Sequence, residues 1–142
     1  MGTPYETDVA AWAYEQAAYL RAGDFAALDL MQLAEEIEDV ARSERRELHS
    51  RLAVLVAHLL KWKFQPDHRV RSWESTIRLQ REEIGLLLGE SHSLRNVFEN
   101  EKRMRTVWHD AVHLAERETK LSFPDTWIWS VEQVLDETFF PD

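Results

Sequence analysis

The chain has 142 residues, a net charge of −9 and no cysteine. Its length suits one domain with a core of its own, and the lack of cysteine excludes disulfides, thiolate nucleophiles and cysteine-based zinc sites. Four glycines, four prolines, six tryptophans and 30% charged residues are typical of a helical globular protein and exclude a disordered chain.

The start of the chain does not look like a targeting segment. Glu6, Asp8 and Glu15 fall within the first twenty residues, where a secretory signal would have a basic region. No apolar run approaches the roughly 20 residues that cross a bilayer. We therefore expect a cytoplasmic protein that does not enter the membrane.

Charge is segregated along the sequence. Residues 1–40 carry nine acids and one base, residues 41–81 carry ten bases and four acids, and residues 82–142 carry thirteen acids and six bases. The overall acidity argues against a general nucleic-acid binder. We expect the basic middle to pair with its acidic flanks inside the fold.

The first predicted element is a helix from about Asp8 to Ala22. Thr7 or Asp8 can cap its first amides, and Gly23 ends it. The pattern predicts an inner face that carries Val9, Trp12, Ala13, Tyr19 and Leu20.

The second element has no glycine or proline from Leu28 to Gln65, and Asp29 suits its capping position. Apolar residues recur every three or four positions, which predicts a helix of roughly 55 Å. The pattern thins between Arg42 and Glu47, so two helices meeting near Ser43 are the alternative to one long helix, straight or bent. Nothing local forces a break, which favours the single helix. The predicted apolar stripe comprises Leu30, Leu33, Ile37, Val40, Ala41, Leu48, Leu52, Leu55, Leu59 and Trp62.

Three further segments follow the breakers at Pro66, Gly89 and Pro124. Ser72 and Ser93 are good caps and open predicted helices that end near Leu88 and Thr119. Ser130 caps a short helix through Leu135, and we expect 139–141 to fold back onto the bundle.

No stretch alternates with the period of a β-strand, and no hairpin dipeptide occurs. The sequence therefore predicts an all-α protein. Its architecture is a helical bundle of four or five helices around one long central helix, in a single domain over residues 1–142.

Several motifs spread over the chain form a recognisable combination. They are Tyr5-Glu6-Thr7-Asp8 with Trp12, the stretch 33–39, His58-Leu59-Leu60-Lys61-Trp62 followed by Pro66, Arg71-Ser72-Trp73, and Glu118-Thr119 with Leu121, Phe123 and Pro124. Together they resemble domain of unknown function family 29, which occurs in cyanobacteria and proteobacteria. The resemblance covers essentially the whole chain. It implies a bacterial, α-helical protein and implies no activity.

An acidic cluster of Glu35, Glu36, Glu38 and Asp39 is the first candidate for chemistry. Carboxylates at this helical spacing can bind a divalent cation or transfer protons. The alternative is a solvated acidic face that pairs with Arg42 or Arg21. Glu36 borders the apolar stripe, so we expect it to be partly buried and to need a basic partner.

His58 lies in a stretch that is apolar on all sides and is either a hydrogen-bonded core residue or a ligand. Lys61 follows one turn later with a stem long enough to reach solvent. Glu36 lies about 33 Å from His58 along a continuous helix, so the two can share a site only if the chain reverses near Ser43.

A basic, aromatic corner over residues 61–73 is the strongest functional signal. Arg69 and Arg71 flank the start of a helix at Ser72, whose amides can bind an anion. Bases interleaved with Trp62 and Trp73 also suit stacking on a nucleotide or single-stranded nucleic acid. The structural alternative is a corner held together by ion pairs.

Glu118 follows the predicted inner stripe of the last long helix. A carboxylate there should be paired or have a raised pKa, and Arg71 or Lys61 is the natural partner. An acid, a histidine and a base at one end of a bundle are what a small active site looks like, and equally what a satisfied polar network looks like.

Other chemical motifs are weak. His109 and His113 lie four residues apart, but the glutamate of a His-Glu-x-x-His zinc motif is missing. No nucleophile elbow, phosphate loop or dinucleotide fingerprint occurs. We predict no metal and no cofactor.

The leading hypothesis is a non-enzymatic binding or interaction protein whose corner takes an anionic ligand or a protein partner. A homodimer through Trp127 and Trp129 is a further expectation. The alternative hypothesis is a small metal-binding or hydrolytic helical-bundle enzyme that uses Glu36, His58, Arg71 and Glu118. The residues considered for a site are Glu36, His58, Lys61, Trp62, Arg69, Arg71, Ser72, Trp73 and Glu118.

Overall fold

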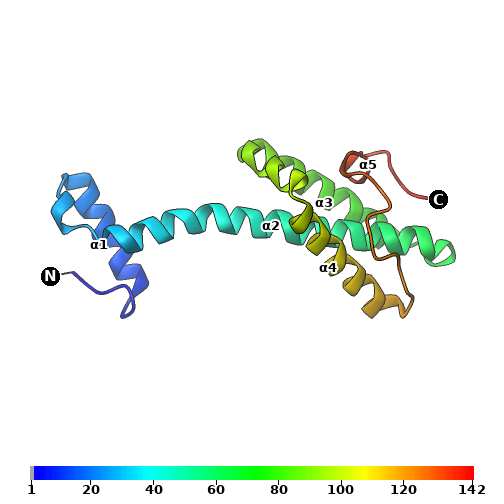
Figure 1. Ribbon diagram of the computed structural model, residues 1–142, viewed down its shortest axis with the longest axis horizontal. Coiled ribbons are helices and arrows are strands. Elements are labelled where there is room, and N and C mark those ends of the chain that lie inside the picture. Colours follow the sequence, from blue (N-terminus) through cyan, green and yellow to red (C-terminus); the bar gives the residue numbers. More distant parts are fainter. Residues whose placement is uncertain (1) are drawn as a thin grey trace. The chain divides into compact units, whose positions relative to one another are not determined.

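The computed structural model describes residues 2–142, and over these it contains helices and no strand. The α-helices are α1 (Val9–Ala22), α2 (Leu30–Phe64), α3 (Arg71–Glu90), α4 (Glu101–Thr119) and α5 (Val131–Leu135) (Figure 1). Three short 3₁₀ helices join them: η1 (Phe25–Ala27), η2 (Pro66–His68) and η3 (His92–Glu99). The predicted all-α class with one long helix is confirmed.

These elements form two compact units. The N-terminal unit comprises the described residues up to Arg42, and the C-terminal unit comprises Ser43–Asp142. Helix α2 contributes residues to both. The expectation of a single domain over residues 1–142 stays a prediction, and the two units are described in turn.

In the N-terminal unit, α1 begins and ends as its capping residues predict. The side chain of Asp8 accepts a hydrogen bond from the amide of Ala11 at 3.0 Å, and Gly23 ends the helix with a φ of +73°. The Trp12 indole donates to Asp29 Oδ2 at 3.3 Å, and the amide of Asp29 donates to Gln16 Oε1 at 2.8 Å. These two bonds fasten α1 to the start of α2.

The predicted inner face of α1 is mostly wrong. Trp12 is buried as predicted, whereas Val9 and Leu20 are exposed. Gln16, which was not part of the predicted inner face, is buried. The reason is local: little chain lies against α1 in this unit, so it covers one large side chain and not a full apolar stripe.

Helix α2 runs from Leu30 to Phe64 without interruption. The alternative of two helices meeting near Ser43 is therefore wrong, and the chain does not reverse there. The predicted stripe is only half right, because Leu48, Leu52 and Leu55 are fully buried while Ile37 and Val40 stand exposed. A periodic pattern shows which face of a helix is apolar but not what covers it.

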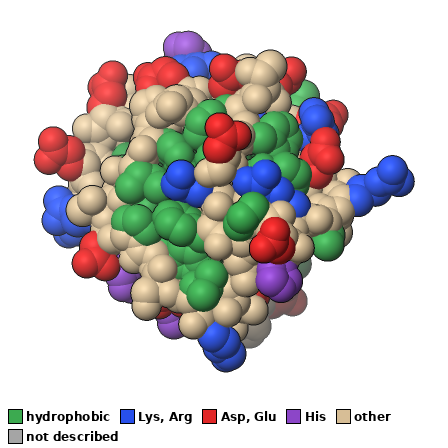
Figure 2. Space-filling model, turned by 90° about the vertical axis from the view of Figure 1, so that its right-hand side faces the viewer, with side chains coloured by type: hydrophobic (Ala, Val, Ile, Leu, Met, Phe, Trp, Pro, Cys, Tyr) green, Lys and Arg blue, Asp and Glu red, His purple; other side chains and the backbone are tan. Residues whose placement is uncertain are grey.

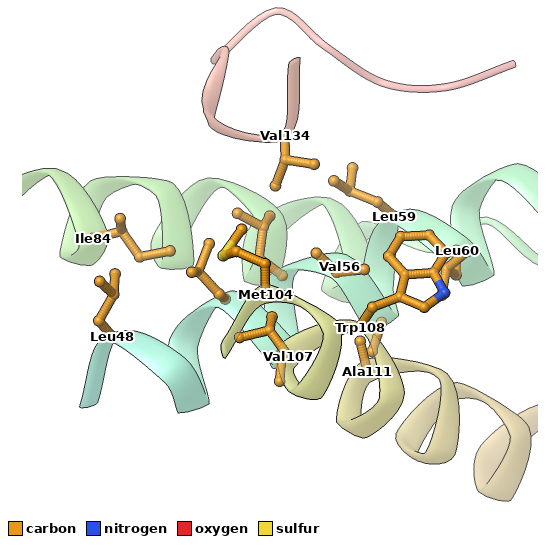
Figure 3. Packing of buried hydrophobic residues seen from close by; sticks show 14 of the residues in the cluster. Leu48, Val56, Leu59, Leu60, Ile84, Met104, Val107, Trp108, Ala111 and Val134 are labelled. Atoms are coloured by element: carbon orange, nitrogen blue, oxygen red, sulfur yellow. The ribbon is translucent and has the colours of Figure 1, made fainter. Parts of the chain in front are cut away.

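The core lies in the C-terminal unit. Figure 3 shows side chains from α2, α3, α4 and α5 converging, with Val56 and Trp108 near the middle and Val134 of α5 above them. Helix α3 runs back beside the second part of α2, and α4 crosses it (Figure 1). Fully buried large side chains are Trp108, Leu48, Leu52, Leu55, Leu59, Leu60, Ile77, Ile84, Val56, Val107 and Val134.

Two predicted helix caps are wrong. Helix α3 begins at Arg71, one residue before Ser72, and its capping residue Val70 has no side-chain hydrogen bond to offer. Ser93 lies inside η3, and α4 is capped instead by Asn100, whose side chain accepts from the amide of Arg103 at 3.1 Å. Over the eight residues of η3, the 3.0-residue period of a 3₁₀ helix is hard to tell from the 3.6-residue period of an α-helix, which explains the second error.

The C-terminal tail is fixed to the bundle as expected. Ser130 caps α5 in a reciprocal arrangement with Gln133, which matches the sequence prediction. Beyond α5, the ring of Phe140 packs against Trp62 with centroids 5.2 Å apart, and Pro141 is buried. No helix among residues 2–142 is long and apolar enough to cross a membrane.

Candidate functional site

A polar cluster forms where α2 and α4 meet in the C-terminal unit. Lys61 is buried, and its ammonium group donates a hydrogen bond to Glu118 Oε2. The same ammonium lies 5.1 Å from the ring centroid of Trp73 on α3. Burying a cation is costly unless it is paired, so the carboxylate and the aromatic face explain how Lys61 is tolerated in the core.

Glu118 is half exposed at its side chain, unlike the buried Lys61. Its pKa is lowered, chiefly by the hydrogen bond from Lys61 and further by the charge of that ammonium group. Of the two partners considered for Glu118, Lys61 is the one in contact. Glu118 is therefore an anchored carboxylate at the edge of the unit.

His58 lies one turn before Lys61. Its Nδ1 is 2.8 Å from the carbonyl oxygen of Val54, and a carbonyl can only accept, so Nδ1 carries the proton. Burial lowers the pKa of His58, and Lys61 lowers it further, against the opposing effects of Val54 and Glu118. The neutral ring thus keeps Nε2 as a hydrogen-bond acceptor, which is the form a general base or metal ligand needs.

Glu36 does not have the basic partner that was expected. It is half-buried in the N-terminal unit and accepts from Gln32 Nε2 at 3.4 Å. It also raises the pKa of Tyr5 through a hydrogen bond. The neighbouring acids Glu35, Glu38 and Asp39 all pair with Arg42, at 3.2, 3.4 and 2.8 Å. The acidic cluster is thus largely the ion-paired face proposed as its alternative.

The corner over residues 61–73 holds the chain's own tail. Arg69 Nε donates to the carbonyl of Trp62 at 2.8 Å, and its Nη2 donates to the carbonyl of Pro141 at 3.2 Å. The guanidinium of Arg69 also stacks over Trp62, 4.9 Å from the ring centroid. Lys63 donates to the carbonyl of Asp142 at 3.3 Å. These cations act largely as a clamp.

Arg81 of α3 completes this clamp, although it was not among the residues predicted for a site. It is buried and donates to the carbonyls of Val134, Glu137 and Phe139, at 2.9, 3.5 and 2.7 Å. Burial lowers its pKa. The sequence did contain a signal for Arg81, because it falls between Ile77 and Ile84 on the apolar face of α3. A buried arginine at such a position must find hydrogen-bond acceptors.

Among the exposed residues of the corner, two lie at the start of α3. Arg71 and Ser72 occupy the first turn of α3 and are exposed. The first helical amides lack a side-chain cap, since the capping residue is Val70. This end of α3 therefore keeps the open amides and adjoining cation that were expected to suit an anion, although Ser72 does not cap the helix.

A surface pocket on α4 was missed entirely. Its volume is about 430 Å³, and Trp108 and Val112 form part of its wall. His109 and His113, which the sequence singled out for their spacing, both line it, together with Arg105, Glu116 and Asp125. Among residues 2–142, no three histidine or acidic side chains are arranged to hold a metal ion.

Trp127 and Trp129 serve the interior and not an open aromatic face. Trp127 Nε1 donates to the carbonyl of Met104 at 2.7 Å, and its ring lies 5.1 Å from that of Trp108. Trp129 packs against Trp108 and Phe139. A homodimer stays a prediction, but these two rings do not form an exposed aromatic patch through which it could assemble.

The basic middle of the sequence does pair with acidic flanks within each unit. Arg42 pairs with Glu35, Glu38 and Asp39 in the N-terminal unit. In the C-terminal unit, Arg51 lies 3.7 Å from Glu83, and Lys61 pairs with Glu118. The expected pairing of the charge segments is therefore confirmed at these positions.

The protein is thus a small all-α protein with one long helix, a C-terminal tail held by arginines and the motif set around His58 and Arg71. The chain belongs to the family described as Domain of unknown function DUF29, whose family model matches residues 4–140. The resemblance drawn from the motifs is thereby confirmed. No curated protein and no solved structure matches the chain.

Proposed function

We propose that the protein is a non-enzymatic binding protein whose C-terminal unit binds an anionic group of a ligand or partner at the start of α3. One observation carries this proposal: Arg71 and Ser72 stand exposed on the first turn of a 20-residue helix that has no side-chain cap. Open amides, the helix dipole and a guanidinium all favour negative charge at the same place.

The surroundings suit an anion attached to a larger, partly apolar molecule. Phe64 and Val70, on either side of η2, are 38% and 48% exposed. Figure 2, which looks onto this end of the C-terminal unit, shows hydrophobic side chains gathered around lysine and arginine side chains. Such a mixed surface is common where proteins meet partners.

The clamp around the tail gives this surface a fixed shape. Arg69 and Lys63 are engaged with carbonyls of residues 141 and 142, and Arg69 also holds the ring of Trp62. A preorganised surface loses little conformational entropy when a ligand binds. The composition, free of cysteine, fits our proposal that the protein acts in the bacterial cytoplasm.

The experiment is a titration with inorganic phosphate and, separately, with a short acidic peptide, followed by tryptophan fluorescence because Trp62 and Trp73 lie close to the site. Arg71→Ala should weaken binding of both probes about tenfold, the equivalent of one charge-assisted hydrogen bond. Arg95→Ala, which removes an exposed arginine on η3, is the matched control. Equal affinities for the two variants would contradict the proposal.

The enzymatic alternative has one observation in its favour. His58 is held neutral by burial with Nε2 available, next to the Lys61–Glu118 pair, and such perturbed clusters are frequent in active sites. A screen for hydrolysis of activated esters and phosphate esters, comparing the wild type with His58→Asn, tests it. Activity that survives the substitution would rule out this histidine as the base.

A further inference from the structure

A row of apolar side chains lies bare on the first part of α2. It consists of Leu30, Leu33, Ile37 and Val40, here called the α2 stripe, whose spacing of three, four and three residues places them on one helix face. Leu30, Ile37 and Val40 are 68%, 69% and 68% exposed, and Leu33 is half-buried. Single exposed apolar residues are ordinary, but a contiguous row of this kind marks a binding face.

The spacing tells what shape fits the stripe. A three-four repeat of apolar residues is the pattern by which one α-helix packs along another. The stripe spans about 15 Å at 1.5 Å per residue, so a partner helix of about three turns covers it. Helix-on-helix docking through such anchors is a common mode of peptide recognition.

The charge around the stripe tells which helix fits. Up to Arg42 the chain contains nine acids and two bases. Glu36 and Glu38 are next to Ile37 in sequence and so lie on the two flanks of the stripe. Arg42 is shared among Glu35, Glu38 and Asp39, while Glu36 accepts hydrogen bonds from two neutral side chains, those of Gln32 and Tyr5. The flanks therefore stay negative.

We propose that the α2 stripe binds an amphipathic helix of another protein whose apolar face is bordered by lysine and arginine. Apolar anchors of the partner bury Ile37 and Val40, and its basic border meets Glu36 and Glu38. A second copy of this chain fits poorly, because it brings the same excess of seven negative charges to the contact. This site is independent of the anion site at the start of α3.

The test uses the full chain and two fluorescently labelled synthetic helices of about 14 residues. Both carry the same leucines at three-four spacing, and they differ only in lysine and arginine against glutamate at the flanking positions. Fluorescence anisotropy measures binding to the wild type, to a double variant with Ile37→Ser and Val40→Ser, and to Leu86→Ser. Leu86 is 58% exposed on α3 and serves as the matched control. Circular dichroism checks that each variant keeps its helices.

We expect the basic helix to bind at least about tenfold more tightly than the acidic one. The double variant should lose about tenfold or more of that affinity, Leu86→Ser should lose none, and Glu36→Gln should weaken binding with a reduced dependence on salt. Equal binding of the two helices, or equal loss in the double variant and the Leu86 control, overturns the proposal. So does a stable homodimer in light scattering that the double variant dissociates, because the stripe would then belong to a second copy.

Discussion

The two units of this chain use similar apolar patterns to different ends. In the C-terminal unit, twenty-one apolar side chains from α2, α3, η3, α4, the following loop and α5 form one buried core. Among the described residues up to Arg42, Trp12 and Gln16 are buried, and long apolar side chains of α2 stay exposed. The comparison teaches that amphipathic periodicity specifies a helix and its apolar face. Whether that face is buried depends on whether other elements of the chain pack against it.

The largest expected effect on stability comes from truncating an apolar side chain of α2 to alanine in the C-terminal unit, compared with the same kind of truncation in the N-terminal unit. Leu55→Ala should lower the free energy of unfolding by about 2–5 kcal/mol, because Leu55 is fully buried and its loss leaves a cavity. Ile37→Ala should change it by less than about 0.5 kcal/mol, because the removed atoms face solvent. Urea denaturation followed by circular dichroism measures both, and equal losses would break the comparison.

Arg81 tests how the C-terminal unit closes its core. Arg81→Leu leaves the carbonyls of Val134, Glu137 and Phe139 without their donor, and we expect a loss of about 2–3 kcal/mol with faster proteolysis of residues 131–142. Arg78→Leu is the control, since Arg78 is exposed and lies equally close to Phe140. If residues 131–142 are cleaved no faster in Arg81→Leu than in Arg78→Leu, Arg81 does not hold the tail in place.

A smaller effect should appear in the dependence of stability on pH. The pKa of His58 is lowered in the folded chain from its usual 6.5, chiefly by burial, so the unfolded state takes up the proton at a higher pH than the folded state. The stability from this group is therefore complete above pH 6.5 and is lost as pH falls through the folded pKa.

Replacing His58 by asparagine should remove this part of the pH dependence, because the amide keeps an N–H for Val54 but does not titrate. The measurement is the denaturation midpoint from pH 7.5 down to pH 5, above the range in which Glu118 titrates. An unchanged slope in His58→Asn would show that other groups cause it.

Much of the fold follows from local chemistry. Asp8, Gly23 and Ser130 begin or end helices because their side chains or backbone freedom satisfy the terminal groups, and such signals are readable in one sequence. The absence of a breaker between Leu28 and Gln65 likewise predicted the long helix. Ser72 was a misleading signal because α3 begins at Arg71, so this serine lies inside the first turn and does not cap it.

The candidate site was harder to predict. Arg71 and Lys61 were the two partners named for Glu118, and the contact with Lys61 is confirmed. The inward position of Arg81 on α3 was readable in the sequence, but its acceptors were not, because they are main-chain carbonyls. The α2 stripe was assigned to the core because its period is that of a buried face, and exposure depends on tertiary neighbours that no periodicity encodes.

Amide hydrogen exchange, read by mass spectrometry along α2, tests the central contrast most directly. We expect amides of residues 31–40 to exchange at least about a hundredfold faster than those of residues 52–60, since only the latter are locked by a packed core. Adding the basic amphipathic helix should slow the amide exchange of residues 31–40 and leave the exchange rates of residues 52–60 unchanged. Uniform protection along α2 in the free protein would contradict the account.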